Sequence, residues 1–182
     1  MDTKNTQKIV HEFKKHMLTY ILVLLALLFV VLFRKPLIVL GLIILGGLST
    51  IYKRIVNVPI GFELITFFSL ILTFTFSVWV GVISMVLMIL ISHITTGRIC
   101  ATMFGKMVVY GFLLVIALFF SSANIVWVGI GLSAVLYVIL FFMYVFVFGY
   151  NPLSSFTSAV GGVIFNYIFF TKFAEILLKA LL

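Results

Sequence analysis

VPIGFELITFFSLILTFTF (Val58–Phe76) decides the fold, together with SVWVGVISMVLMILIS (Ser77–Ser92) and HITTGRICATMFGK (His93–Lys106), which follow it directly. The first two stretches are apolar runs joined by almost no loop, and Glu63 is the only charged residue in either run. An antiparallel pair of helices would return Glu63 to the membrane face that carries His93, Arg98 and Lys106. We therefore expect any chemistry of this chain where these side chains converge.

The composition requires a membrane. The chain has 182 residues, of which 65% are hydrophobic and 9% charged. A soluble domain of this size needs far more polar side chains at its surface, so lipid must cover part of this chain. No charged residue occurs between Lys106 and Lys172, and this interval alone can hold more than two spans of about 20 residues. Runs such as Leu22–Phe33 are apolar at every position, which excludes the alternating pattern of a membrane β-barrel. We expect an all-α, polytopic helical bundle.

The apolar segments predict seven membrane helices. A polar, interfacial N-terminal head over 1–16 precedes a single membrane domain over 17–182, in which an extra helix 17–33 stands before a six-helix core, 37–182. Six spans are the alternative if the short first pair does not cross fully. The longest polar interval after the head, His93–Gly105, is expected to be a loop. The seven expected spans are 17–33, 37–52, 59–76, 81–92, 107–121, 125–148 and 156–170.

The charges predict orientation and exclude some partners. The net charge is +8, which in this composition indicates Lys and Arg beside lipid headgroups and no nucleic-acid partner. The head and the loops near Lys53, Arg98 and Lys106 share one face and hold most of the cations, so the positive-inside rule places the N-terminus in the cytoplasm of a multi-pass cell-membrane protein. Cys100 is the single cysteine, so neither an intramolecular disulfide nor a thiolate metal cluster can form.

Glu63 is the first candidate for a functional residue, because an ionisable group within a span is costly and often functional. It has either a substrate or proton role, or a structural one in which it reaches water or pairs with Arg54. Arg98 and Lys106, with His93 nearby, either bind an anionic group through charge-assisted hydrogen bonds or form a solvated loop that sets topology. His93 has no second ligand at metal-binding spacing, so we expect no metal site and no cofactor.

Amides and glycines are the remaining candidates. Asn151 and Asn166 either contact the ligand or stabilise the fold, and Asn166 falls inside an expected span, where an amide usually hydrogen-bonds another helix. Gly41, Gly46 and Gly47 let another helix approach closely, within this chain or on a docked partner protein.

Enzyme classes find little support in the sequence. No acid lies near a Ser and His pair, and no phosphate-binding Gly-rich loop is followed by Lys and Ser or Thr. Only the residues around Glu63 could supply the convergent ionisable groups of an intramembrane enzyme, which stays a minor alternative. We expect a protein that is not an enzyme.

The stretch Val58–Ser92 resembles the signature region of the substrate-binding S components of energy-coupling factor transporters. Pro59, Ile60 and Gly61 match the turn that opens one helix in that family, and Gly81 keeps the second glycine of the next turn. The resemblance implies that helix 17–33 is an addition in front of the six helices of that family. It also implies that the loops at Lys53, Arg98 and Asn151 form an external lid over a small-molecule site. It also implies that Gly41–Gly47 lie on the helix that docks the energising membrane subunit. The charge count instead places these loops inside the cell.

The six-helix arrangement is also similar to that of the rod-shape-determining, MreD-like scaffold family. That family has an Asn in a late helix and a C-terminal helix with a basic end, which resemble Asn166–Lys179. We expect a membrane subunit that binds a small, vitamin-like or anionic solute for uptake with partner ATPase and membrane subunits. In this reading Arg98 and Lys106 hold an anionic group, Glu63 orients a polar or cationic group, and Asn151 and Asn166 add neutral hydrogen bonds. The alternatives are a membrane scaffold without ligand and a small intramembrane enzyme.

Overall fold

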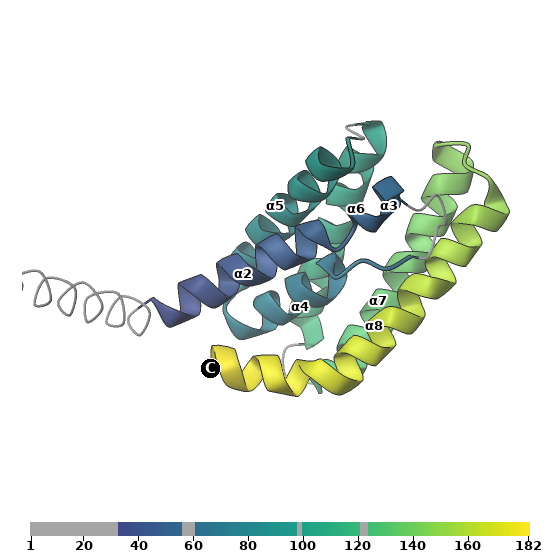
Figure 1. Ribbon diagram of the computed structural model, residues 1–182. Coiled ribbons are helices and arrows are strands. Elements are labelled where there is room, and N and C mark those ends of the chain that lie inside the picture. Colours follow the sequence, from purple (N-terminus) through teal and green to yellow (C-terminus); the bar gives the residue numbers. More distant parts are fainter. Residues whose placement is uncertain (1–32, 56–60, 98–99, 121–123) are drawn as a thin grey trace, which may run out of the picture. The chain divides into compact units, whose positions relative to one another are not determined.

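The computed structural model describes residues 33–55, 61–97, 100–120 and 124–182. These residues are helical almost throughout and include no strand. The chain divides into two compact units, Met1–Ile38 and Val39–Leu182, and the packing described below is that of the second. The elements in chain order are α2 (Arg34–Leu48), α3 (Tyr52–Ile55), α4 (Ile65–Thr75), α5 (Val78–Thr96), α6 (Ala101–Ala117), the short 3₁₀ turn η1 (Leu118–Phe120), α7 (Ile125–Phe142), the π-helical turn η2 (Met143–Val147) and α8 (Pro152–Leu181) (Figure 1).

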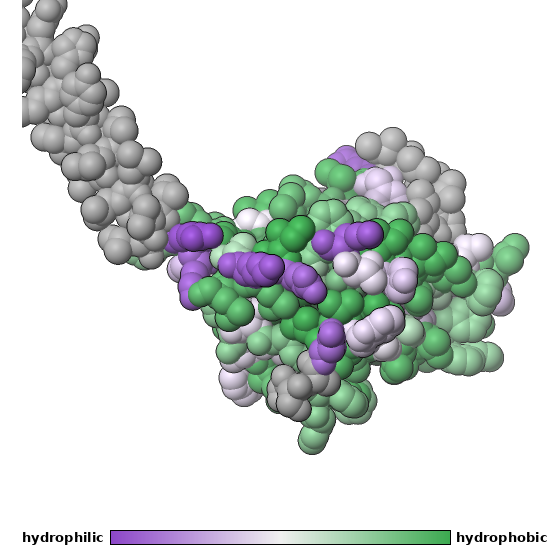
Figure 2. All heavy atoms as spheres, turned by 90° about the horizontal axis from the view of Figure 1, so that it is seen from below, coloured by the Kyte–Doolittle hydropathy of each residue, from purple (hydrophilic) through white to green (hydrophobic). Residues whose placement is uncertain are grey.

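Five of the helical segments are long and apolar enough to cross a membrane, which confirms the predicted class of a membrane-embedded helical protein. Their exposed side chains are largely apolar, and Figure 2 shows a mostly hydrophobic face that is crossed by a row of hydrophilic side chains. The predicted head 1–16 and most of the predicted span 17–33 lie outside the described residues, so the count of seven stays a prediction. The five segments are Arg34–Arg54, Val78–Thr96, Ala101–Phe120, Ile125–Val147 and Pro152–Leu181.

Helix α4 is the centre of the second unit. It contacts α5, α6, α7 and α8, and its residues from Ile65 to Thr73 are all buried. The rings of Phe67 in α4 and Phe170 in α8 meet edge to face with centroids 4.9 Å apart. With 11 residues, α4 is about 16 Å long, which is shorter than the hydrocarbon layer of about 30 Å. Within the predicted span 59–76, helix α4 covers Ile65–Thr75, and the described residues 61–64 before it are not helical.

The predicted loop His93–Gly105 is wrong for most of its length. Helix α5 continues to Thr96, and Gly97 ends it with a φ of 68°, a left-handed conformation that glycine adopts without a steric penalty. Helix α6 begins at Ala101, so the turn between the two helices is short and carries the exposed Cys100. His93 and Thr96 are compatible with a last helical turn, and their polarity alone suggested a loop.

The last two helices form a long antiparallel pair (Figure 1). Asn151 caps α8, because its side-chain oxygen accepts the backbone N–H of Leu153 at 2.9 Å. Helix α8 has 30 residues, so it is about 45 Å long, and it extends beyond the predicted span 156–170 at both ends. At the end of α7 the π turn η2 widens the helix before Gly149 reverses the chain with a φ of 67°.

Candidate functional site

The segment that precedes α4 is held against α8 by a glycine. Gly61 has a φ of +73°, and a Cβ at this position would overlap the carbonyl oxygen of Ser158 and lie 2.6 Å from the backbone nitrogen of Gly162. Only glycine permits both this conformation and this close backbone approach. Three residues later, the backbone N–H of Leu64 donates to the Ser49 hydroxyl at 3.1 Å. These contacts fix Glu63 between α8 and the α2–α3 turn.

Glu63 is the centre of a buried ionic cluster. Its carboxylate accepts hydrogen bonds from the ammonium groups of Lys53 in α3 and Lys106 in α6. The Lys106 Nζ atom lies 3.0 Å from Oε1 and 3.3 Å from Oε2, and the Tyr110 hydroxyl donates to Oε2 at 3.3 Å. The exposed fractions are 6% for Glu63, 12% for the Lys106 side chain and 26% for the Lys53 side chain. We call Glu63, Lys53 and Lys106 the ionic cluster.

The two lysines keep the buried acid ionised. Glu63 precedes α4 and lies outside the five membrane-length segments. Burial by itself would raise the pKa of Glu63, because removing water disfavours the charged carboxylate. The ammonium groups of Lys106 and Lys53 act in the opposite direction, and together they hold the pKa of this carboxyl below its ordinary value. A buried and unpaired Glu63 would be neutral, whereas the paired residue is an anion at neutral pH.

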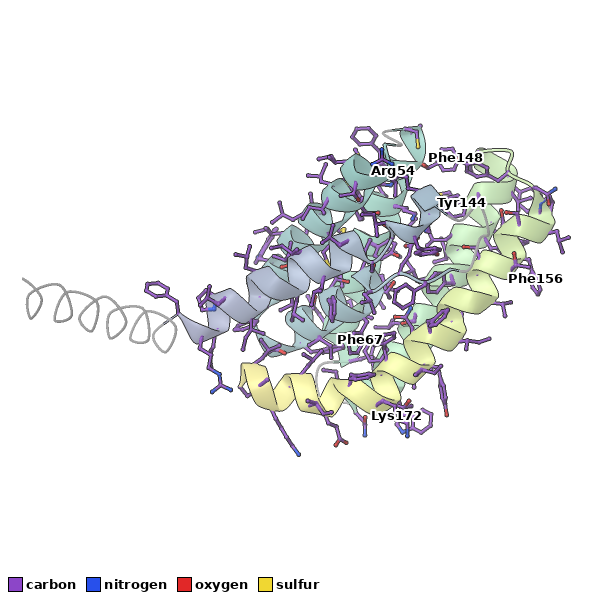
Figure 3. The ribbon with its side chains drawn as sticks, viewed as in Figure 1. Arg54, Phe67, Tyr144, Phe148, Phe156 and Lys172 are labelled. Carbon is purple, nitrogen blue, oxygen red and sulfur yellow. The ribbon has the colours of Figure 1, made fainter. Side chains whose placement is uncertain are left out.

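A small polar cavity borders the cluster. Its volume is about 20 Å³, which is room for roughly one water molecule. Glu63 and Lys106 supply the charges of its lining, and the hydroxyl groups come from α7, η2 and α8. Figure 3 shows Tyr144 of η2 at the same end of the bundle as Arg54 and Phe148, with Phe67 and Lys172 toward the other end. The lining residues are Glu63, Lys106, Tyr137, Leu140, Phe141, Tyr144, Ser155, Ser158 and Ala159.

The structure brings together part of the predicted site. Glu63 and Lys106 meet as expected, although Lys53 takes the place that the structural alternative gave to Arg54. His93 is buried near the end of α5 and is not among the residues that line the cavity, which contradicts the alternative of a solvated loop at this position. Its predicted role in ligand binding stays a prediction. Arg98 lies outside the described residues, and its predicted contact with an anion stays a prediction.

The two asparagines have structural partners. Asn151 is exposed and caps α8 through its side-chain oxygen, and it is not part of the cavity lining. Asn166 is buried between α7 and α8, where its amide nitrogen donates to the Gly162 carbonyl at 2.9 Å and to the Tyr137 hydroxyl at 3.3 Å. Asn166 is not among the residues that line the cavity, but it contacts Tyr137, which does line it.

Two of the three glycines expected to dock a partner pack inside the chain. A Cβ at Gly46 would overlap the Met88 sulfur, and one at Gly47 would lie 2.5 Å from Ile91. Both glycines are buried against α5, so they are not available to a separate subunit. A Cβ at Gly41 would meet nothing within 4 Å, and this position alone of the three is open to a partner.

The sequence analysis did not predict the uncharged hydroxyl groups around the ionic cluster, which we call the neutral half of the site. Tyr110, Tyr137, Tyr144, Ser155 and Ser158 stand in apolar helices, where a hydroxyl is cheap enough to occur at many positions. A usable signal was present for two of them, because the spacing of Tyr137 and Tyr144 is close to two helical turns and places both on one face.

Metal binding has no support in the described part of the chain, where no three His, Cys, Asp or Glu side chains cluster. The charged and hydroxyl groups instead suit hydrogen bonding to a small polar group. Comparison with known proteins gives no match: no family model, no curated protein and no solved structure is similar to this chain.

Proposed function

We propose that this protein is a membrane subunit that binds a small solute with an anionic group at the ionic cluster and serves its uptake. The observation that carries the proposal is the buried cluster of one carboxylate and two ammonium groups beside a polar cavity. Charged groups inside membrane bundles commonly mark substrate or ion pathways. Ligand sites in general are cavities with a few well-placed polar groups.

The depth of the site supports binding inside the bundle. Lys106 stands five residues after the start of α6, which places it about 7.5 Å below the helix end. Lys53 stands near the end of the segment Arg34–Arg54, and its side chain is about a quarter exposed. A ligand entering from this end would therefore meet Lys53 first and Lys106 deeper. The short helix α4, preceded by a non-helical segment, is similar in kind to the interrupted helices that form solute sites in transporters.

Each charged residue has a role in this proposal. Lys106 binds the anionic group of the solute, Glu63 orients a polar or cationic group, and Lys53 closes the site from the outer side. The sequence carries no nucleotide-binding motif, so uptake would depend on a separate energising membrane subunit and its ATPases. Gly41 is the described docking position that stays open to such a partner.

A membrane scaffold without ligand is the second candidate. It is favoured by the cavity volume of about 20 Å³, which admits roughly one water molecule and no vitamin-sized solute. It is also favoured by the three donors that already satisfy Glu63. Solute binding would require the helices around the cavity to move apart, whereas a scaffold could use the observed packing unchanged.

The test is retention of a small molecule by the protein. The full chain is purified in mild detergent, and its low-molecular-weight extract is analysed by mass spectrometry beside extracts of Lys106→Gln and of the control Lys172→Gln. Lys172 is exposed on α8, far along the helix from the cavity. The proposal predicts a stoichiometric compound with a carboxylate or phosphate in the wild type and in Lys172→Gln, and its loss from Lys106→Gln. An empty wild-type protein that co-purifies with membrane proteins would favour the scaffold instead.

A further inference from the structure

Two serine side chains of α8 line the cavity, and their hydroxyls have no hydrogen-bond partner among the described residues. Ser155 is 7% exposed and lines the cavity together with Ser158. Hydroxyls in apolar helices normally donate to a carbonyl one turn earlier, as Ser133 does to Gly129 at 2.6 Å and Thr171 does to Tyr167 at 2.8 Å. Within the described part of the chain, neither Ser155 nor Ser158 has such a bond. Ser155 is buried whereas Ser158 is half-buried. Because a buried polar group is rarely left unsatisfied, the Ser155 hydroxyl points to an occupant of the cavity.

The size of the cavity limits that occupant. A volume of about 20 Å³ holds roughly one water molecule or one monatomic ion. A carboxylate or phosphate that belongs to a larger molecule would require movement of the surrounding helices. The occupant of the observed state is therefore a single small particle.

The charges decide between an anion and a cation. Among the described residues that line the cavity, Glu63 is the only carboxylate, and it already accepts two ammonium groups and a tyrosine hydroxyl. Within the described ranges the other acidic side chain is Glu175, which stands 20 residues after Ser155 on α8 and hence about 30 Å along the helix. The cavity thus presents the Lys106 ammonium and several hydroxyl donors, beside a carboxylate that is already neutralised. A cation would be repelled by Lys106, whereas an anion would accept these donors.

We propose that the cavity binds a monovalent anion of the size of chloride, held by the Lys106 ammonium and by the hydroxyls of Ser155 and Ser158. The inference rests on the proposed function only for the location of the site, and it adds that the resting site holds an inorganic anion. The anionic group of a solute would displace this ion, so chloride and solute would compete. Tyr144, which also lines the cavity, supplies a further hydroxyl from η2.

Equilibrium dialysis with radioactive chloride tests the inference. The purified full chain is dialysed in sodium gluconate at constant ionic strength, because gluconate is larger than the observed cavity and competes only if the surrounding helices move apart. We expect saturable binding of about one chloride per chain. Ser155→Ala should weaken binding about tenfold or more, since one hydrogen bond to a charged group is lost. The matched control is Ser154→Ala, which removes an exposed hydroxyl next to it on the same helix and should leave affinity unchanged.

The outcomes separate this inference from the proposed function. No saturable chloride binding by the wild type would overturn the inference and indicate a cavity filled by water. Equal affinities of wild type, Ser155→Ala and a second variant, Tyr144→Phe, would overturn it as well, because the bound ion would then lie elsewhere. Chloride binding by a protein that retains no solute would leave the inference standing and contradict the uptake function. A protein that retains a solute, and that binds no chloride even after this solute has been dialysed away, would support the uptake function and overturn the inference.

Discussion

Replacement of Glu63 by Gln should destabilise the protein more than removal of either lysine. The neutral amide would leave two ammonium groups without a counter-charge, and the Lys106 side chain is only 12% exposed. Breaking a buried ion pair in this way costs about 3–5 kcal/mol. In a chain of this size 1 kcal/mol shifts the melting temperature by about 2–4 °C. We therefore expect the midpoint of Glu63→Gln to fall by roughly 6–20 °C.

Replacement of Lys106 and replacement of Lys53 should destabilise the protein by different amounts. Lys106→Gln leaves Glu63 paired with Lys53, so it should cost about 1.5–3 kcal/mol, as for one hydrogen bond to a charged group. Lys53 is 26% exposed and partly solvated, and its replacement by Gln should cost about 1 kcal/mol or less. The expected order of destabilisation is Glu63→Gln, then Lys106→Gln, then Lys53→Gln.

The assay is heating of the detergent-solubilised protein followed by size-exclusion chromatography, which measures the fraction that stays monodisperse at each temperature. The double variant Glu63→Gln/Lys106→Gln completes a mutant cycle and should be more stable than Glu63→Gln alone, because only one uncompensated ammonium remains. A double variant whose loss equals the sum of the two single losses would refute the ion-pair reasoning. Equal midpoints for Lys53→Gln and Glu63→Gln would refute the argument from burial.

Three further predictions concern the segments around the cluster. Gly61→Ala should lower the melting midpoint several degrees more than Gly97→Ala, because both glycines have a positive φ but only Gly61 touches the α8 backbone; equal midpoints would show that the close approach is unimportant. Asn166→Ala should cost about 0.6–1.7 kcal/mol, the usual range for hydrogen bonds between membrane helices, and Tyr137→Phe combined with it should add little; a fully additive double variant would contradict the shared bond. Because the pKa of Glu63 is lowered in the folded protein, its stabilisation should be complete above its unfolded pKa of about 4.3 and lost as pH falls below that value; midpoints measured from pH 7 to pH 3 should decline at the acid end in the wild type and less in Glu63→Gln.

The charged half of the site could be predicted because few choices existed. A chain with one acid between Glu12 and Glu175 has little else to neutralise a buried lysine, and the tight connection of two apolar runs returns Glu63 to the loop end of the bundle. The identity of its partners was harder to predict. Lys53 and Arg54 are adjacent in the sequence, and only the direction of the short helix α3 decides which of them reaches the carboxylate.

The neutral half and several boundaries could not be predicted from the residues alone. Continuous apolar composition hides which face of a helix is buried, so Ser155 carries no signal that distinguishes it from the exposed Ser154. The packing partners of the glycines could not be predicted from the sequence either. Gly46 and Gly61 both permit close approach, but the sequence does not say that the first meets a Met88 side chain and the second an α8 backbone. Tertiary packing decides both.

The exposed cysteine in the α5–α6 turn makes the sidedness of this protein measurable without engineering. Cys100 lies six residues before Lys106, at the end of the bundle toward which the ionic cluster opens. It is also the only thiol in the chain. A membrane-impermeant maleimide applied to intact cells will therefore modify the native protein if its ionic cluster opens to the outside, and will spare it if the cluster opens to the cytoplasm. One natural side chain thus reports which compartment supplies the ligand.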